Sequence, residues 1–413
     1  MSDYLRDPEL DRLVDQLNSD SAAGEPPEPE IEPLAGAQEP RQVTVLDDGE
    51  PLSRLLFDMA RRGASDLVLI PDLPPILRLD GRLAATPHPA LSEEEIRSMF
   101  SPYLVAARAR QQLAEEGSAD FSLRLGDGGG DGGGNPSPAG FRFRVNLHRQ
   151  RGRLAAALRA LPREIPTLAR LNLPPALARL VQVSRGLVLV CGPIGSGKSS
   201  TLAALLGEIN RTRAAHILTI EDPVEYEHGN LRSIVEQIEI GLDAPSFPAA
   251  LRASLRQDPD VILVGEMRDL ETVATALTAA ETGHLILSTL HTSDVVQAIH
   301  RIVDVFPAGQ QAQIRQQLAL ALHAIVFQQL LPRADGGGRV PAIELLMATY
   351  PVRHHIRSQS LQKLYTEITL GKGHGMISFE DSLAALVKSG VVALEEARMR
   401  SARPDELDSL LRV

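Results

Sequence analysis

The sequence is nearly free of cysteine, since Cys191 is the single thiol among its 413 residues. One thiol excludes an internal disulfide and any cysteine-rich zinc site. A chain without disulfides is typical of a reducing compartment, so we expect a cytoplasmic protein.

Aromatic residues are also scarce. They make up 3% of the chain, with no tryptophan, so a stacking surface for single-stranded nucleic acid is poorly supplied. The net charge of -11 and the pI near 5.5 point the same way, because nucleic-acid backbones attract basic surfaces. We therefore expect an aliphatic core and no direct nucleic-acid partner.

Long hydrophobic runs are missing too. The longest, Leu318 to Phe327, is short and is interrupted by His323, and the N-terminus lacks the basic-then-apolar pattern of an export signal. We predict no transmembrane segment. Any peripheral association with the inner face of the cytoplasmic membrane must therefore come through a partner.

Composition and periodicity divide the chain into five parts. The first is acidic and rich in proline, and we expect it to be disordered because it cannot bury enough apolar surface to fold. Leucines and a valine at positions 10–17 mark one short amphipathic helix there, either a docking helix or a frayed one. The parts are a leader at 1–45, a small mixed α/β domain at 46–165, a linker at 166–185, an α/β core at 186–345 and a helical region at 346–413.

In the small domain, apolar spacing predicts a helix at 52–59 and strands at 65–70 and 75–81. The glycine-rich segment 126–138 lies between two strand-like runs, so we interpret it as a hairpin tip rather than a ligand-binding loop. Prolines mark the linker. In the following core, alternating strands and helices predict a mostly parallel sheet covered on both faces.

Residues 192–199 fit the pattern G-x-x-x-x-G-K-[ST] at every fixed position. An apolar run at 187–191 precedes them and aliphatic residues at helical spacing follow, so the glycine-rich turn joins a strand to a helix. This context identifies a phosphate-binding loop. The predicted nucleotide-binding residues are Gly192, Pro193, Ile194, Gly195, Ser196, Gly197, Lys198, Ser199 and Ser200.

Each part of this loop has a chemical task. The glycines let backbone N–H groups converge on a phosphate, and the helix dipole adds partial positive charge. Lys198 can reach the outer phosphates, and the Ser199 hydroxyl can ligate Mg²⁺. We therefore predict a bound nucleotide with Mg²⁺.

Hydrolysis also needs carboxylates that hold Mg²⁺ and polarise a water, and acids follow two strand-like runs. The run 216–220 leads into Glu221 to Glu225, and the run 261–264 leads into Glu266. The second run resembles a Walker B strand, with Gly265 where many ATPases carry an aspartate. A third run, 284–290, leads into His291, a candidate γ-phosphate sensor.

Each of these residues has a plainer explanation, as a helix cap, a solvated loop residue or a hydrogen-bonded histidine. Together they follow a phosphate loop in chain order, and each lies at the end of an apolar strand. Ligand sites of α/β proteins gather at such strand ends. The combination therefore predicts an active site.

These motifs resemble those of the secretion ATPase superfamily, and within it most closely those of the type IV pilus retraction ATPases, the PilT family. The resemblance extends from about residue 50 to the C-terminus and is densest between 186 and 306. The matching stretches are 192–200, 220–225, 258–269, 280–284 and 289–292.

The resemblance implies a PAS-like N-terminal α/β domain, a RecA-like P-loop ATPase domain and a helical C-terminal region. It also implies a homohexameric ring in the cytoplasm, at the base of a pilus machine, that acts on an inner-membrane platform protein. The implied cofactors are ATP and Mg²⁺.

Roles for individual residues follow from the same resemblance. Lys198 and Ser199 would hold phosphate and Mg²⁺, and Glu225 of the Asp box would be the general base. Glu266 would be the Walker B acid that binds the metal, and His291 would belong to the His box.

The resemblance also assigns arginines to the site. Arg144 and Arg159 match family arginines that face the nucleotide at a domain and subunit interface, where they stabilise charge on the transferred phosphoryl group. Arg252 and Arg256, four apart on a predicted helix, would share one face and form a second candidate pair. The alternative for all four is a surface salt bridge.

Three features bear on the subfamily. The paired Cys-x-x-Cys motifs of pilus assembly and type II secretion ATPases are absent. The retraction family's C-terminal Ala-Ile-Arg-Asn-Leu-Ile-Arg-Glu motif corresponds to 351–358, with His355 in place of leucine, and Ile238 stands where the family usually has arginine. These departures bear on how hydrolysis is coupled to retraction.

We therefore expect an ATP-hydrolysing hexameric motor that powers type IV pilus retraction and twitching motility. One alternative is a pilus assembly, type II secretion or DNA-uptake ATPase of the same superfamily. The other is a low-turnover, nucleotide-binding regulatory subunit of the pilus motor.

Overall fold

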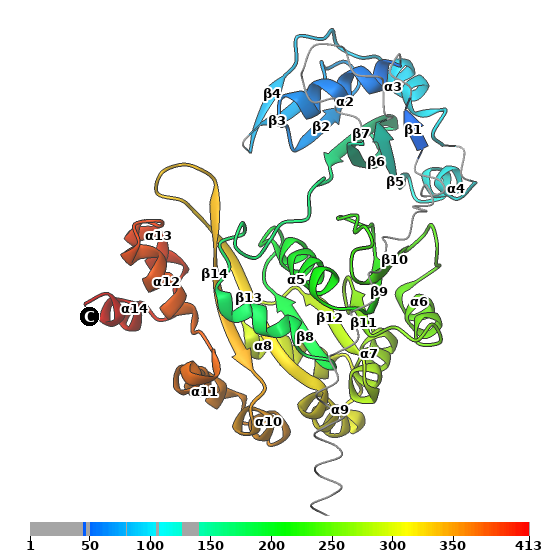
Figure 1. Ribbon diagram of the computed structural model, residues 1–413. Coiled ribbons are helices and arrows are strands. Elements are labelled where there is room, and N and C mark those ends of the chain that lie inside the picture. Colours follow the sequence, from blue (N-terminus) through cyan, green and yellow to red (C-terminus); the bar gives the residue numbers. More distant parts are fainter. Residues whose placement is uncertain (1–43, 47–49, 80, 105–106, 126–139, 413) are drawn as a thin grey trace, which may run out of the picture. The chain divides into compact units, whose positions relative to one another are not determined.

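Figure 1 shows the protein as a computed structural model that describes residues 44–46, 50–79, 81–104, 107–125 and 140–412. The described residues all belong to one compact unit. The predicted amphipathic helix at 10–17 and the hairpin tip at 126–138 lie outside the described residues.

The first part of the chain folds into a seven-stranded sheet in the order β1-β5-β6-β7-β2-β3-β4. β1 runs parallel to β5 and the other neighbours are antiparallel. The strands are β1 (Thr44–Leu46), β2 (Asp66–Leu69), β3 (Ile76–Leu79), β4 (Arg82–Ala85), β5 (Ser118–Leu125), β6 (Arg142–Gln150) and β7 (Arg153–Ala160). The predicted strands at 65–70 and 75–81 are confirmed as β2 and β3.

Alternation along these strands separates an apolar face from a polar one. Phe143, Val145 and Leu147 of β6 are fully buried, against a core that α2 (Pro51–Arg61) and α3 (Glu93–Phe100) help to form. The third helix of this part is α4 (Ala107–Glu115). Because side chains alternate between the faces of a strand, the arginines at even positions of β6 lie on the opposite face.

The first domain begins earlier than the leader prediction allowed. Thr44 and Val45, which we assigned to the leader, belong to β1 and pair with Leu123 and Arg124 of β5. A short run with β-branched residues suits an added edge strand even after an acidic, proline-rich segment.

The second sheet also has seven strands, in the order β10-β9-β11-β12-β8-β13-β14, and all neighbours are parallel except β13 and β14. Every residue of β8, β11 and β12 is buried, as expected for parallel strands covered on both faces. The strands are β8 (Gly186–Cys191), β9 (His216–Glu221), β10 (Ile234–Glu239), β11 (Val261–Val264), β12 (Leu285–Leu290), β13 (Leu322–Pro332) and β14 (Arg339–Met347).

Helices cover both faces of this sheet. On one face, α5 (Lys198–Thr212) packs with the valines of β8. The other face carries a larger core (Figure 1) formed with α6 (Phe247–Ser254), α7 (Leu270–Thr282), α8 (Val295–Asp304) and α9 (Ala308–Ala321). The predicted parallel α/β core is thereby confirmed.

The segment 166–185, which we predicted as a linker, packs against the core of the second sheet. It contains a 3-10 helix, η1 (Pro175–Val181), in which Leu177 and Leu180 are buried in the same cluster as α5. Pro174 and Pro175 suggested a flexible connection, but proline also suits the start of a helix. This segment is therefore part of the folded core.

Helices follow the second sheet to the end of the described chain. They join the core on the face that carries α6 to α9, with Leu364, Leu383 and Leu407 fully buried. They are α10 (Tyr350–Arg357), η2 (Leu361–Lys363), α11 (Leu364–Leu370), η3 (Gly371–His374), α12 (Phe379–Lys388), α13 (Leu394–Arg400) and α14 (Pro404–Arg412). Within the described residues no helix combines the length and apolar character needed to cross a membrane.

Candidate functional site

The phosphate loop lies between the end of β8 and the start of α5. Gly192, Gly195 and Gly197 have φ angles of 148°, 76° and 86°, a region that residues with side chains rarely adopt. A Cβ added at Gly192 would lie 2.2 Å from the main-chain oxygen of Gln328, so no larger residue fits there. The loop therefore has the close backbone approach that a phosphate cradle requires.

Gln328 of β13 braces this loop, and sequence reasoning missed it. Its amide nitrogen donates to the Ser196 carbonyl at 2.6 Å, and its amide oxygen accepts from the Thr201 hydroxyl at 2.7 Å. The side chain is buried, with 3% of its surface exposed. A polar residue inside the apolar run of β13 was the signal that could have revealed it.

Lys198 is buried at the start of α5. Its ammonium donates to the carbonyls of Gly192 at 3.0 Å and Pro193 at 2.9 Å, and to Nδ1 of His291 at 3.2 Å. Burial lowers the pKa of Lys198, and the negative charges of Glu266 and Glu225 oppose that shift. An entering phosphate would offer the ammonium stronger acceptors than these carbonyls.

His291 connects Lys198 to the acid that follows β11. Because an ammonium can only donate, Nδ1 of His291 must accept, which leaves the proton of the neutral imidazole on Nε2. That nitrogen lies 3.8 Å from Oε2 of Glu266, whose other oxygen is 2.5 Å from Nε of Arg268. Burial and then the charge of Lys198 lower the pKa of His291, so the neutral form predominates at pH 7.

Strand order explains why these residues meet. β12 lies between β8 and β11, so the phosphate loop, His291 and Glu266 follow three adjacent parallel strands at one edge of the sheet. Gly265 is also explained, since a Cβ there would lie 3.2 Å from the Ile220 carbonyl of β9. Close packing against β9 thus occupies the place of the usual aspartate side chain.

The Asp-box loop, residues 222–228, follows β9. Glu221, the last residue of β9, is partly buried, and desolvation raises its pKa to about 7. The Glu225 N–H donates to Glu221 at 3.4 Å, and the Tyr226 hydroxyl lies 2.7 Å from the Ser200 hydroxyl of α5. The second contact joins the Asp-box loop to α5, the helix that follows the phosphate loop.

Comparison with known proteins now decides the family. Residues 159–374 match the family model described as type II/IV secretion system protein. Over 354 residues the chain is 40% identical to the type IV pilus retraction ATPase PilT of Pseudomonas aeruginosa. The alignment covers 86% of this chain and 99% of that relative. The chain belongs to the PilT family of secretion ATPases.

Two further similarities cover nearly the same length. The chain is 37% identical over 360 residues to the type IV pilus ATPase PilU of Pseudomonas aeruginosa. This alignment covers 87% of this chain and 91% of that relative. A crystal structure of the pilus retraction motor PilT with bound ADP covers 87% of this chain and 99% of that chain, at 44% identity and a TM-score of 0.77. The predicted fold class, an N-terminal α/β domain followed by a RecA-like ATPase domain, is therefore confirmed.

The side chains around the phosphate loop of this PilT-family ATPase offer a donor set that fits Mg²⁺. Ser199 is exposed on the first turn of α5, and Glu266 supplies a carboxylate nearby. No group of three histidine, cysteine or acidic side chains that could hold a metal occurs among the described residues.

The structure does not bring Arg144 and Arg159 of this PilT-family chain to the phosphate loop. They lie directly opposite each other on β6 and β7. Arg144 lies 3.7 Å from Asp120, and Arg159 lies 2.8 Å from Asp66. Within one chain, both arginines therefore pair with acids of their own sheet, and their role at the nucleotide stays a prediction.

The interpretation of the second arginine pair was wrong in one respect. α6 ends at Ser254, so Arg256 lies beyond the helix and cannot share a helical face with Arg252. Arg252 forms an ion pair with Glu271 at the start of α7. The helix stops short because the backbone turns before β11, with Asp258 at a positive φ of 55°.

The two departures from the family pattern also have defined surroundings. Ile238 of β10 is partly buried and packs against the main core. His355 of α10 lies 3.1 Å from Glu367 of α11, and its neighbour Arg353 donates to carbonyls at the end of α9. The C-terminal motif of this PilT-family chain thus joins three helices.

Proposed function

We propose that this PilT-family ATPase is a motor that hydrolyses ATP and powers type IV pilus retraction. The observation that carries the proposal is the linked set of Lys198, His291 and Glu266 beside the phosphate loop, in a chain that matches a retraction ATPase over 99% of that relative. Such a set supplies the phosphate-binding charge, the phosphate sensor and the acid that hydrolysis requires.

The residues divide the chemical work as follows. Backbone N–H groups of the phosphate loop and Lys198 bind the phosphates, and Ser199 and Glu266 would hold Mg²⁺, which would supply charge neutralisation there. The Glu225 carboxylate accepts a proton from the attacking water, and His291 contacts the γ-phosphate. Arg144 and Arg159 complete the site from a neighbouring subunit and stabilise charge on the transferred group.

We also propose that the active form is a homohexameric ring in the cytoplasm that acts on an inner-membrane platform protein. Support comes from the placement of Arg144 and Arg159, each of which pairs with an acid of its own sheet within one chain. A nucleotide site that needs these arginines must then receive them from a neighbouring subunit. Motion of the first domain against the ATPase core would transmit the energy of hydrolysis.

A low-turnover regulatory subunit is the second candidate. The replacements at Ile238 and His355 support it, because they leave the phosphate site intact for nucleotide binding but change residues that bear on the coupling of hydrolysis to retraction. A pilus assembly, type II secretion or DNA-uptake ATPase differs from both in its phenotype, since loss of a retraction motor leaves excess immobile pili.

The decisive experiment measures ATPase turnover per subunit against protein concentration for the wild type, Glu225→Gln and Arg144→Ala. We expect turnover to rise as rings assemble and to collapse in both variants, by about 100-fold or more for the loss of the base. Turnover that stays at background while nucleotide still binds would reject the motor and favour the regulatory subunit.

A further inference from the structure

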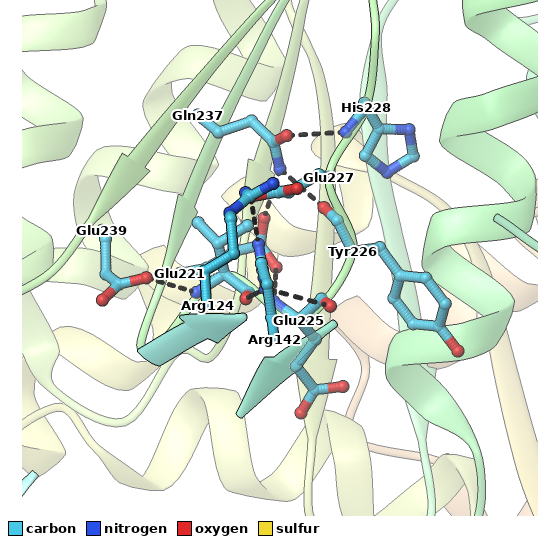
Figure 2. Close-up of polar contacts among 10 residues, drawn as sticks. Arg124, Arg142, Glu221, Glu225, Tyr226, Glu227, His228, Gln237 and Glu239 are labelled. Atoms are coloured by element: carbon cyan, nitrogen blue, oxygen red, sulfur yellow. Dashed lines mark hydrogen bonds and ion pairs between the residues drawn. The ribbon is translucent and has the colours of Figure 1, made fainter. Parts of the chain in front are cut away.

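The Asp-box loop, which carries Glu225, is held from within the ATPase core. Glu239 of β10 accepts from the Val224 N–H at 3.1 Å. Gln237 accepts from the His228 N–H at 2.8 Å and donates to the Tyr226 carbonyl at 2.9 Å. These bonds fix the side of the loop that faces β10 (Figure 2).

The first domain holds the same loop from the other side. Arg142, at the start of β6, donates to the carbonyls of Val224 and, at 3.3 Å, of Glu225. Its guanidinium also lies 2.8 Å from the carboxylate of Glu227, which Arg124 of β5 contacts as well. Figure 2 shows both arginines directed at the loop, with the Glu225 carboxylate pointing away from them.

This contact is buried and specific. The Arg142 side chain is 9% exposed, so its charge has lost most of its contact with water. A guanidinium presents several N–H donors in a fixed plane, and here they reach two backbone carbonyls and one carboxylate. The Glu227 side chain is 42% exposed, so the Arg142 guanidinium is the desolvated partner of this ion pair.

The two carbonyls that Arg142 contacts belong to Glu225 and to the residue before it. Fixing both carbonyls fixes the peptide planes on either side of the Glu225 Cα atom, and therefore the direction in which its side chain leaves the backbone. In Figure 2 the Glu225 side chain leaves this stretch of backbone in the direction away from Arg142. The first domain thereby orients a carboxylate that it does not touch.

We propose that Arg142 is a positioning residue that aligns the general base through the backbone of the Asp-box loop, and so makes hydrolysis depend on where the first domain sits. The inference rests on the proposed function, in which Glu225 is the base. When the first domain moves away from this loop, the base loses its alignment and hydrolysis slows.

The test compares Arg142→Ala and Arg142→Lys with Arg149→Ala, a matched control at an exposed position of the same strand. Steady-state turnover, equilibrium affinity for ADP and melting temperature are measured for each full-length variant. We expect Arg142→Ala to lower kcat by about 10–100-fold, as for a catalytic group misplaced by about 1 Å. ADP affinity should stay within about 2-fold, and Arg142→Lys should recover part of the loss.

A second comparison separates positioning from folding. Glu227→Gln removes the ion pair but leaves both carbonyl bonds to Arg142, so we expect a smaller loss of kcat. The double variant with Glu227→Gln and Arg142→Lys should lose less kcat than the product of the two single fold-losses, because the two residues act as one unit. If Arg142→Ala does not fold, the Arg142→Lys variant decides: a loss of kcat with unchanged ADP affinity and melting temperature supports positioning.

Two results would overturn the inference, and they are distinguishable from failure of the proposed function. In the first, folded Arg142 variants keep wild-type kcat while Glu225→Gln is inactive. In the second, ADP affinity falls as far as kcat does, which indicates a binding role instead. If Glu225→Gln itself retains full turnover, the proposed assignment of the base fails.

Discussion

Glu221 shows at the scale of one residue how the site sets a pH dependence. Burial raises its pKa to about 7 from an ordinary value of 4.5, so between these values the folded protein binds a proton that the unfolded chain releases. Stability therefore falls as the pH rises from 4.5 to 7. Each pKa unit corresponds to about 1.4 kcal/mol, so the loss reaches about 3 kcal/mol at most.

We predict that Glu221→Gln removes this loss, because a neutral amide carries no buried charge at any pH. Melting temperatures of the variant and the wild type should be similar at low pH, and the variant should become the more stable of the two above pH 7. Thermal melts across this range check the prediction, with the exposed Glu395→Gln as control. A difference that does not change with pH would contradict it.

The candidate site residues that could be predicted are those whose position depends on a short local sequence pattern. The phosphate loop, Glu266 and His291 each follow an apolar strand directly, so their placement depends on a pattern a few residues long. Gln328 could not be assigned this way, because its partner Ser196 is 132 residues away. Arg142 and Glu227 were missed for the same reason, since only the folded chain brings them together.

At the scale of elements, η1 is a folded part of the second core, although its prolines indicated a linker. The sequence around it indicated a break between domains, and the strands and helices on either side were found at the expected places. Leu177 and Leu180 could not be recognised as core residues, however, because a 3-10 helix of seven residues gives too short a periodic pattern. Burial against α5 is a tertiary property of this segment.

We predict that Leu177→Ala lowers the free energy of unfolding by about 2–5 kcal/mol, because Leu177 is fully buried and the truncation leaves a cavity. Urea denaturation measures the change. The matched control, Gln182→Ala at the exposed end of η1, should stay within about 0.5 kcal/mol of the wild type. Equal effects for the two variants would restore the linker interpretation.

At the scale of the whole molecule, residues Pro40–Val413 form a compact unit that includes both sheets and the contact between Arg142 and the Asp-box loop. The acidic composition of the first part predicted its boundary to within a few residues of β1. How the two domains contact each other could not be predicted, because that contact depends on paired side chains from distant strands.

We predict that deleting residues 1–39 leaves the melting temperature of the chain within about 2 °C, because both sheets and their cores lie in the remaining unit. Differential scanning calorimetry of the shortened and full chains tests this. A drop of several degrees would mean that the deleted segment packs on the folded unit.

Cys191 gives the protein a practical property. It is the last residue of β8 and has no exposed surface, and burial raises the pKa of its thiol to about 12. Maleimide dyes react with thiolates, so we expect Cys191 to stay unlabelled while cysteines introduced at exposed positions react. Cysteines placed at the exposed positions of Arg149 and Glu395 would each take a dye, and energy transfer between the dyes would follow the first domain through successive turnovers without removing the native thiol.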